Sequence, residues 1–263
     1  MKCSLIITTY NRPKALELVL LSVERQTVLP AEVIIADDGS DDKTQAIIDN
    51  FQSKNILNIQ HSWQEDKGFR AAKSRNKAIA TSTQEYIVLI DGDMVLHTHF
   101  VADHLEHAQK GYLIQGKRSL LTKERTDLAI NNQTTYFYFL DNGLKNQKNS
   151  LYSNQLSRIF SSKKTHLKGI KTCNMSFFKS DCISVNGFNE NFEGWGREDS
   201  EFVVRLFNYG VFRKTLRFKA IQYHLFHHEN SRGRLHDNDA ILQYSIANRL
   251  NWCDDGIDKH LKG

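Results

Sequence analysis

The sequence has few cysteines and no long apolar run, and each shortage excludes a class of protein. The four cysteines, Cys3, Cys173, Cys182 and Cys253, are scattered along 263 residues and form no Cys-x-x-Cys pair. This pattern argues against a zinc ribbon and a disulfide framework, and it favours a reducing, cytosolic compartment. No run of about 18 apolar residues occurs, so the sequence predicts no transmembrane helix. We therefore expect any membrane contact to be peripheral.

Two sequence motifs are also missing. No Gly-x-Gly-x-x-Gly follows the first predicted strand, which excludes a Rossmann dehydrogenase. The N-terminal apolar run is short and lacks a small-residue cleavage site, so we expect no signal peptide. The chain holds 35 Lys and Arg against 30 Asp and Glu, and the net charge of +5 is too weak to indicate nucleic-acid binding. Length and composition are those of one globular domain, with room for a small appendage.

The first hundred residues alternate between apolar runs and amphipathic segments. Predicted strands cover 3–10, 31–40, 56–63 and 86–93. Two predicted helices begin at Pro13 and at Asp41-Asp42, and a third spans roughly 70–80. This order predicts βαβ units and a parallel sheet with helices on both faces. Because ligands bind at the carboxyl ends of such strands, we expect the polar residues that end them to share one crevice.

The second half is less regular. We expect strands at 111–121, 172–178 and within 212–230, and a glycine-rich loop that leads into a helix over 194–210. Residues 121–170 carry eight Lys and Arg against three Asp and Glu and resemble an insertion or a lid. Their charge would suit an anionic acceptor or an anionic bilayer, although a solvated surface insertion has the same composition.

The triplet Asp91-Gly92-Asp93 is the first candidate for chemistry. It follows the apolar run 87–90, and two carboxylates placed there could hold Mg²⁺ or Mn²⁺ on a diphosphate. An Asp-Gly turn is the plain alternative. A second triplet, Asp237-Asn238-Asp239, lies in a polar run, and we interpret it as a solvated loop or a helix cap.

Two more motifs lie in the first half. Asp38, in Asp37-Asp38-Gly39-Ser40, could accept from a nucleobase or a ribose, while the same run could cap the next helix. In the segment 67–78, Gly68 permits close backbone approach, and the cations Lys73 and Arg75 would balance a diphosphate. A solvated basic helix face is the alternative for the lysines.

Two motifs lie in the second half. In 194–199, Trp195 offers a flat face to a sugar, and Glu198 and Asp199 begin a helix whose dipole would favour their ionised, basic forms. Helix-start acids beside a core tryptophan are the alternative. Residues 223–228 contain three histidines. A strand would point His224 and His227 to opposite faces, so we expect one of these histidines to bind a metal.

Together these motifs resemble family 2 glycosyltransferases, the inverting group with the GT-A fold. TTYNRP (8–13), ADDGS (36–40), KGFRAAKSRN (67–76) and DGD (91–93) are similar to the nucleotide-sugar half of that family. GWGREDSEF (194–202), followed by Tyr223-His224, resembles the acceptor half of β1,4-galactosyltransferases and of bacterial chondroitin-polymerase-like enzymes. The resemblance implies a nucleotide-sugar half over 1–110 and an acceptor half over 111–263 of one GT-A domain.

The resemblance also implies a role for each matched residue. The nucleotide-sugar would contact Thr9, Tyr10, Asn11, Asp38, Gly68, Arg75 and Asp91; the metal would bind Asp93 and His224, with His227 as the substitute; the acceptor would contact Trp195 and Glu198; and Asp199 would be the catalytic base. Two positions differ from the family pattern. Gly92 stands where a bulkier residue is usual, and Arg197 stands where galactosyltransferases typically carry glycine.

The resemblance therefore implies an inverting transfer of a hexose or N-acetylhexosamine from a UDP-sugar, with Mn²⁺ or Mg²⁺. The acceptor would be a hydroxyl of a glycan or glycolipid of a bacterial surface, such as lipopolysaccharide or capsule, reached from the cytoplasmic side of the membrane. Two rival interpretations are a sugar nucleotidyltransferase and a carbohydrate-binding protein without activity. The first would need a glycine-rich basic loop after the first strand, where TTYNRP stands. The second would not need the acids at 93, 198 and 199.

Overall fold

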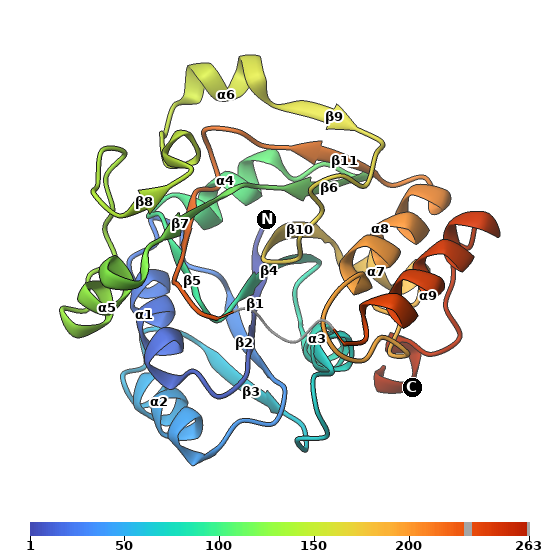
Figure 1. The fold of residues 1–263 in the computed structure, drawn as a ribbon, viewed down its shortest axis with the longest axis horizontal. Helices are drawn as coiled ribbons and strands as arrows, with labels where there is room; N and C mark the ends of the chain where they lie inside the picture. The colour runs from blue at the N-terminus through green and yellow to red at the C-terminus, as the bar shows by residue number, and fades with distance from the viewer. Residues whose placement is uncertain (229–232, 262–263) are drawn as a thin grey trace.

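A large mixed sheet runs through the centre of the computed structural model, which describes residues 1–228 and 233–261 (Figure 1). Its strands are β1 Cys3–Thr9, β2 Glu32–Asp37, β3 Ile59–Trp63, β4 Tyr86–Asp91, β6 Tyr112–Gln115, β9 Ser162–Lys164, β10 Asn174–Phe178 and β11 Phe212–Thr215. Within the described residues they are ordered β3-β2-β1-β4-β10-β6-β11-β9. The strands β1 to β4 are parallel, as the sequence predicts.

A smaller sheet and a set of helices complete the fold. The smaller sheet has the order β5-β12-β7-β8, with β5 Met94–Leu96, β7 Arg118–Leu121, β8 Leu144–Lys145 and β12 Gln222–His224. The helices are α1 Pro13–Glu24, α2 Asp42–Ser53, α3 Ala71–Thr81, α4 Phe100–His107, α5 Lys123–Asn131, α6 Asn154–Phe160, α7 Lys179–Ser184, α8 Glu198–Tyr209 and α9 Leu235–Ala247, with short 3₁₀ turns at η1 Gln147–Asn149 and η2 Ile257–His260. Among the described residues, no helix is long and apolar enough to span a membrane.

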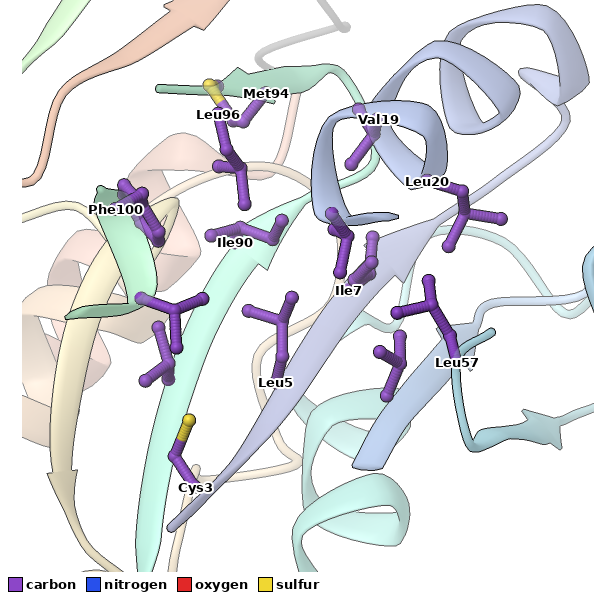
Figure 2. Close-up of a cluster of buried hydrophobic side chains, with 14 of the residues drawn as sticks. Cys3, Leu5, Ile7, Val19, Leu20, Leu57, Ile90, Met94, Leu96 and Phe100 are labelled. Atoms are coloured by element: carbon purple, nitrogen blue, oxygen red, sulfur yellow. The ribbon is translucent and has the colours of Figure 1, made fainter. Parts of the chain in front are cut away.

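Helices cover both faces of the large sheet because its strands alternate side chains between two apolar cores. One core joins Leu5 and Ile7 of β1 to side chains of α1, α2 and α4. Figure 2 shows this packing, with Leu5 and Ile7 beside Leu20 and Ile90. Ile6 belongs to the opposite core, with side chains of α3 and α8. Each fully buried side chain of this size contributes about 1.5–3 kcal/mol, which makes the pattern a strong determinant of the fold.

The helix boundaries follow local signals that the sequence contains. Pro13 is the first residue of α1, where its missing N–H costs nothing. Asp41 caps α2, and its side chain accepts from the backbone N–H of Lys43 at 3.2 Å. Gly210 ends α8 in the left-handed region at φ 101°. All three boundaries agree with the sequence-based expectation.

The single strand expected over 111–121 is wrong, because the chain divides there between the two sheets. The strand β6 pairs with β10 and β11 in the large sheet, whereas β7 pairs with β12 and β8 in the small one. The division falls at Gly116, against which the Asn174 amide packs so closely that an added Cβ would lie 2.2 Å from its Oδ1. The predicted strands within 212–230 divide in the same way into β11 and β12.

Residues 121–170 contribute to both sheets. The strand β8 pairs with β7 in the small sheet, and β9 pairs with β11 at the edge of the large one. The helix α5 precedes β8, and α6 lies along the top of the view in Figure 1, next to β9. The segment therefore consists of regular elements that are paired with the rest of the chain.

Asn76 of α3 fastens the first half of the chain to the second. Its side-chain amide donates to the Phe188 carbonyl at 2.7 Å and to Glu190 Oε1 at 2.9 Å. Its Oδ1 accepts from the Phe188 N–H at 2.8 Å, and the side chain is fully buried. Removing this amide would leave buried backbone groups of Phe188 without partners.

We predict that Asn76→Ala lowers the free energy of unfolding by about 3 kcal/mol. Chemical denaturation followed by circular dichroism measures this change. Asn50→Ala on the exposed side of α2 is the matched control and should change stability by less than about 0.5 kcal/mol. Equal effects of the two substitutions would contradict the role of Asn76.

Candidate active site

Three strand ends and the start of one helix form the site. In the sheet register Thr9 of β1 lies opposite Asp37 of β2, and Thr8 lies opposite Asp91 of β4. The polar residues that end these strands therefore meet at one edge, as expected. The helix α8 begins at Glu198, which approaches the same edge through an ion pair with Arg75.

Two loops at this edge are tied to each other. The backbone N–H of Asn11 donates to Ser40 Oγ at 2.9 Å, and Asn11 Oδ1 accepts from the Asp41 N–H at 2.8 Å. Asn11 has a left-handed backbone with φ 47°, which asparagine tolerates better than most residues. Thr9 Oγ1 is buried nearby and lacks a hydrogen-bond partner within the described part of the chain. The motifs around Thr9 and Ser40 thus form one surface.

Asp38 is buried and already carries two hydrogen bonds. Its Oδ1 accepts from Gln64 Nε2 at 2.6 Å, and its Oδ2 accepts from the Arg70 N–H at 2.7 Å. Burial raises the pKa of Asp38, although these two bonds and the charges of Arg70 and Arg75 oppose the rise. Asp38 therefore fixes the loop that leads into α3. Gln64 Oε1 is also buried and has no hydrogen-bond partner among the described residues.

Asp66 brings two predicted residues together. The Tyr10 hydroxyl donates to Asp66 Oδ2 at 2.8 Å, and the Gly68 N–H donates to Asp66 Oδ1 at 3.1 Å. Gly68 has a left-handed backbone at φ 84°, and no atom lies within 4 Å of the place where a Cβ would be. The backbone conformation, and not a lack of space, therefore requires glycine at position 68. Tyr10 itself is exposed at the mouth of the site.

Asp93, His224 and His227 converge in one cluster. The Nε2 atoms of His224 and His227 lie 3.5 and 3.3 Å from Asp93 Oδ2 and 3.1 Å from each other. The expectation that the two histidines point to opposite faces is wrong, because both imidazoles lie beside Asp93. Strand alternation does not apply to His227, because β12 ends at His224 and the chain then turns.

These three side chains fit a divalent cation. One potential ligand atom from each lies within 4.8 Å of the others. Asp93 Oδ1 is buried and without a hydrogen-bond partner among the described residues, so it is free to bind an ion. Burial would raise the pKa of Asp93, but the hydrogen bond and charge of His224 and the charges of Arg12 and His227 lower it below its usual value. Two imidazoles with one carboxylate favour Mn²⁺ over Mg²⁺, which prefers oxygen ligands.

Arg75 links the acids of β4 to those of α8. Its guanidinium lies 3.6 Å from Asp91 Oδ1 and 3.2 Å from Glu198 Oε1, and its Nε donates to Thr8 Oγ1 at 3.3 Å. The side chain is 5% exposed. Burial would lower the pKa of Arg75, but the charges of Glu198 and Asp91 raise it. The structure thus places Arg75 between two carboxylates, where the sequence predicts a partner for the nucleotide-sugar.

Asp199 lies next to this bridge and has a shifted pKa. Burial and the charge of Glu198 raise the pKa of Asp199 to about 7, against the opposing charge of Arg75. The expectation that the helix dipole keeps Asp199 ionised is therefore wrong. The half-buried position and a like charge one residue away outweigh a dipole effect of about 0.3–1 kcal/mol.

The comparisons with known proteins agree with this geometry. The glycosyl transferase family 2 model matches residues 4–178. The chain belongs to glycosyl transferase family 2. The N-terminal domain of galactosyltransferase matches residues 154–229, which include α8 and β12. The family and the fold expected from the sequence motifs are thus confirmed.

Relatives of this family 2 chain include polysaccharide synthases. Hyaluronan synthase of Pasteurella multocida is 30% identical over 93% of this chain and 26% of its own length, and chondroitin synthase of Escherichia coli is 26% identical over 94% and 37%. Validoxylamine A glucosyltransferase of Streptomyces hygroscopicus subsp. limoneus is 28% identical over 79% and 48%. The chain therefore spans about a quarter to a half of these relatives.

A solved structure has the same fold. The crystal structure of S. aureus TarS superposes with a TM-score of 0.64 at 19% sequence identity, over 99% of this chain and 41% of TarS. Residues 1–349 of TarS superpose with a TM-score of 0.62 at 20% identity, over 99% of this chain and 70% of that one, in a complex with UDP-GlcNAc.

The structure explains the glycine at position 92 and gives Arg197 a partner. An added Cβ at Gly92 would lie 3.0 Å from Thr9 Oγ1, because the Gly92 N–H donates to the Thr8 carbonyl at 2.7 Å. Arg197 has a left-handed backbone at φ 79° and pairs with Asp239 at 2.5 Å. The second acidic triplet, expected in a solvated loop or a helix cap, thus lies in the first turn of α9 and provides a partner for Arg197.

Sequence reasoning missed several charged residues of this family 2 site. Arg12 Nη1 lies 2.6 Å from Asp93 Oδ2, and its Nη2 donates to the Phe226 carbonyl at 3.3 Å. The charge of Arg118 acts on Asp91 and Asp93 from the other side. For Arg12, the sequence signal that could have identified it is its position directly before Pro13, within the motif that ends the first strand. Nothing in the local sequence distinguishes Arg118 from other cations.

We predict that Asp93→Asn and His227→Gln each weaken Mn²⁺ binding by at least about tenfold, because residues that only orient metal ligands already have effects of this size. Titration calorimetry without donor or acceptor measures the affinity. Asp237→Asn, in the exposed second triplet, is the matched control and should bind Mn²⁺ like the wild type. Unchanged affinity in His227→Gln would remove that residue from the ligand set.

Proposed function

We propose that the chain transfers a hexose or N-acetylhexosamine from a UDP-sugar to a hydroxyl of a glycan acceptor, with inversion at the anomeric carbon. The observation that carries this proposal is the continuous arrangement from Asp93 through Asp91, Arg75 and Glu198 to Asp199. This arrangement would bring the proposed metal ligand Asp93 and the proposed base Asp199 into one site. Residues 1–110 would form the donor half and 111–263 the acceptor half, with 121–170 as part of the acceptor half.

The donor proposal rests on the surface formed by the carboxyl ends of β1, β2 and β4. Thr9, Asn11 and Asp38 would face the nucleoside, and Asp91 would face the ribose and the sugar. Gly68 and Tyr10 border the same surface through Asp66. A UDP-sugar is further supported by TarS, which is described in complex with UDP and with UDP-GlcNAc.

In the proposed mechanism, a divalent cation held by Asp93, His224 and His227 would neutralise charge on the leaving diphosphate. Glu198 and Trp195 orient the acceptor on the other side of the sugar. Asp199 takes the proton of the attacking hydroxyl. The attack displaces the nucleoside diphosphate from the opposite face in one step, so an α-linked donor gives a β-linked product.

The acceptor would be a bacterial surface glycan or a glycolipid, as in lipopolysaccharide or capsule, glycosylated in the cytoplasm. Peripheral contact with an anionic membrane is part of this proposal. Tyr138 and Leu140 are 76% and 77% exposed, and the cations Lys145 and Lys148 follow them in the chain. Exposed aromatic and aliphatic side chains beside lysines suit a membrane interface. Sedimentation with vesicles that contain or lack anionic lipid tests this contact.

We predict that Asp199→Asn lowers kcat by about 10²–10⁴-fold while UDP binding is retained, because an amide cannot accept the acceptor proton. A coupled assay of UDP release, with calorimetry of UDP in Mn²⁺, measures both quantities. Asp237→Asn is the control, since Asp237 also lies in the first turn of a helix but is exposed. A rate within tenfold of wild type in Asp199→Asn would exclude Asp199 as the base.

Asp199 also predicts the pH dependence of the rate. Its carboxylate must be ionised to accept a proton, so kcat/KM should be maximal above pH 7 and fall as the pH drops through about 7. Glu198→Gln removes the negative charge that raises the pKa of Asp199, so the midpoint of the profile should move to lower pH. A midpoint that stays unchanged or rises in Glu198→Gln would contradict this coupling.

A further inference from the structure

Two segments of the second half contain cations and no acid. Residues 142–180 include eight Lys and Arg and no Asp or Glu, and residues 202–228 include five and none. The fold pairs these segments with each other, because β9 lies in the first and β11 in the second. The positive charges of the two segments therefore lie close together and reinforce each other.

The pairing places like charges directly opposite each other. Lys164 lies opposite Arg213, and Lys163 lies opposite Lys214, in the antiparallel register of β9 and β11. Like charges in such pairs destabilise a sheet. These like-charge pairs oppose the pairing of the strands, which suggests to us a function that uses their positive charge.

The pair Lys164 and Arg213 lies on the face of the sheet that α8 covers. Arg213 is in register with Leu113 of β6, and Leu113 packs with Phe202 and Leu206 of α8. The first turn of α8 carries Asp199. These cations therefore share a face of the sheet with the proposed base.

Arg213 is 2% exposed and its charge is not neutralised locally. Its Nη1 donates to the Lys168 carbonyl at 3.2 Å, and its Nη2 lies 3.3 Å from His166 Nδ1. Its Nε is buried without a hydrogen-bond partner, and within residues 1–228 and 233–261 no carboxylate lies at ion-pair distance. An unpaired buried cation is costly unless an anion comes near it.

Lys164 and Arg213 of this strand pair act by their charges on Lys117, together with Lys171 and Arg217, and we call these five cations the cationic cluster. Burial and the charges of the other four lower the pKa of Lys117. Lys117 is positioned by its carbonyl, which accepts from Asn174 Nδ2 at 2.9 Å, and its Nζ points toward Gly169. The charge of Lys171 also reaches Asp199. The charges of the cluster therefore act both at the sheet edge and on the proposed base.

Figure 1 shows the path that connects these positions. From the tip of β9 the chain passes the end of β6 and enters β10 at the centre of the molecule. Lys171 lies at the inner end of this path, just before β10. A cavity of about 370 Å³ opens beside Lys163 and Lys164 at the outer end. Tyr112 and Phe212 line it from the other face of the sheet edge, because they alternate with Leu113 and Arg213 along their strands. Aromatic faces of this kind can stack on sugar rings.

We propose that the cationic cluster binds an acidic acceptor saccharide, one that carries carboxylate or phosphate groups. The proposal rests on the function proposed above, because it assumes that a saccharide reaches Asp199. Oxyanions would accept charge-assisted hydrogen bonds from the lysines and arginines and would relieve their mutual repulsion. Arg213 is buried, so a flat bilayer does not reach it. Single acidic groups of a saccharide chain can come close enough to be attracted by its positive charge.

Equilibrium binding without donor tests the proposal. The probes are a hexuronate-containing tetrasaccharide and a phosphate-bearing tetrasaccharide, each with its uncharged counterpart, titrated calorimetrically. At least one acidic probe should bind about tenfold more tightly than its counterpart. Lys164→Gln/Arg217→Gln should remove about tenfold or more of this affinity, since bonds to charged groups have effects of this size. Circular dichroism checks that the variant is folded.

Lys2→Gln/Lys43→Gln is the matched control, because it removes two exposed cations outside the cluster and outside the proposed membrane contact. It should bind the acidic probe like the wild type. Equal losses in both double variants, or equal affinity for charged and uncharged probes, would overturn the proposal. Inorganic phosphate that binds as tightly as the saccharides would also overturn it. The same holds if the cluster variant keeps saccharide binding but loses binding to vesicles of phosphatidylglycerol.

Failure of the transferase proposal would look different. Asp199→Asn should retain binding of the acidic probe even when it does not turn over donor. A chain that binds the probe through the cluster but transfers no sugar would contradict the proposed function and leave this subsite in place. A chain that transfers sugar to acidic and neutral acceptors with equal kcat/KM would contradict the subsite alone.

Discussion

The buried guanidinium of Arg75 is the interaction on which the site depends. A cation that is 5% exposed would be strongly destabilising without partners, and its partners come from two distant parts of the chain. Asp91 ends a central strand of the parallel sheet, and Glu198 begins a helix more than a hundred residues later. Arg75 can be buried only when both are in place. The same requirement that stabilises the charge thus fixes the distance between the end of β4 and the start of α8, which we propose as the donor and acceptor sides.

Charge balance around the strand ends follows from this arrangement. Four acids, Asp91, Asp93, Glu198 and Asp199, lie near three arginines, Arg12, Arg75 and Arg118. Each arginine acts on acids of β4 or of the segment that follows it, and Asp199 is the acid on which burial and a like charge dominate. This explains why Asp93 has a lowered pKa and Asp199 a raised one within a single site. A metal-binding carboxylate benefits from the first, and a proton acceptor from the second.

Much of this fold is predictable because its signals are local. Apolar runs that end in polar residues predict β1, β2 and β4, and Pro13, Asp41 and Gly210 mark helix ends within a residue. Metal-site chemistry was also visible in the triplet at Asp91. These features depend on residue type and short spacing, which a sequence shows directly.

The remaining features depend on contacts between distant segments. The division of 111–121 into β6 and β7 falls at Gly116, where the Asn174 amide of a distant strand leaves no room for a side chain. Likewise, His227 reaches Asp93 only because β12 ends one residue after Tyr223. The raised pKa of Asp199 comes from burial by the rest of the fold, which a helix-start motif does not reveal.

The two sides of the sugar differ in how their charge is compensated. On the donor side, buried acids are paired with arginines of the same chain, and a diphosphate would add negative charge that a cation must offset. On the acceptor side, Lys117, Lys171 and Arg213 face no comparable set of acids within the described residues. Such an excess raises the local concentration of anions before any specific contact forms. A ligand that brings its own negative charge to Asp199 would therefore complete the balance that the chain leaves open. This favours an acidic chain over a neutral one as the acceptor in the transfer that we propose for Asp199.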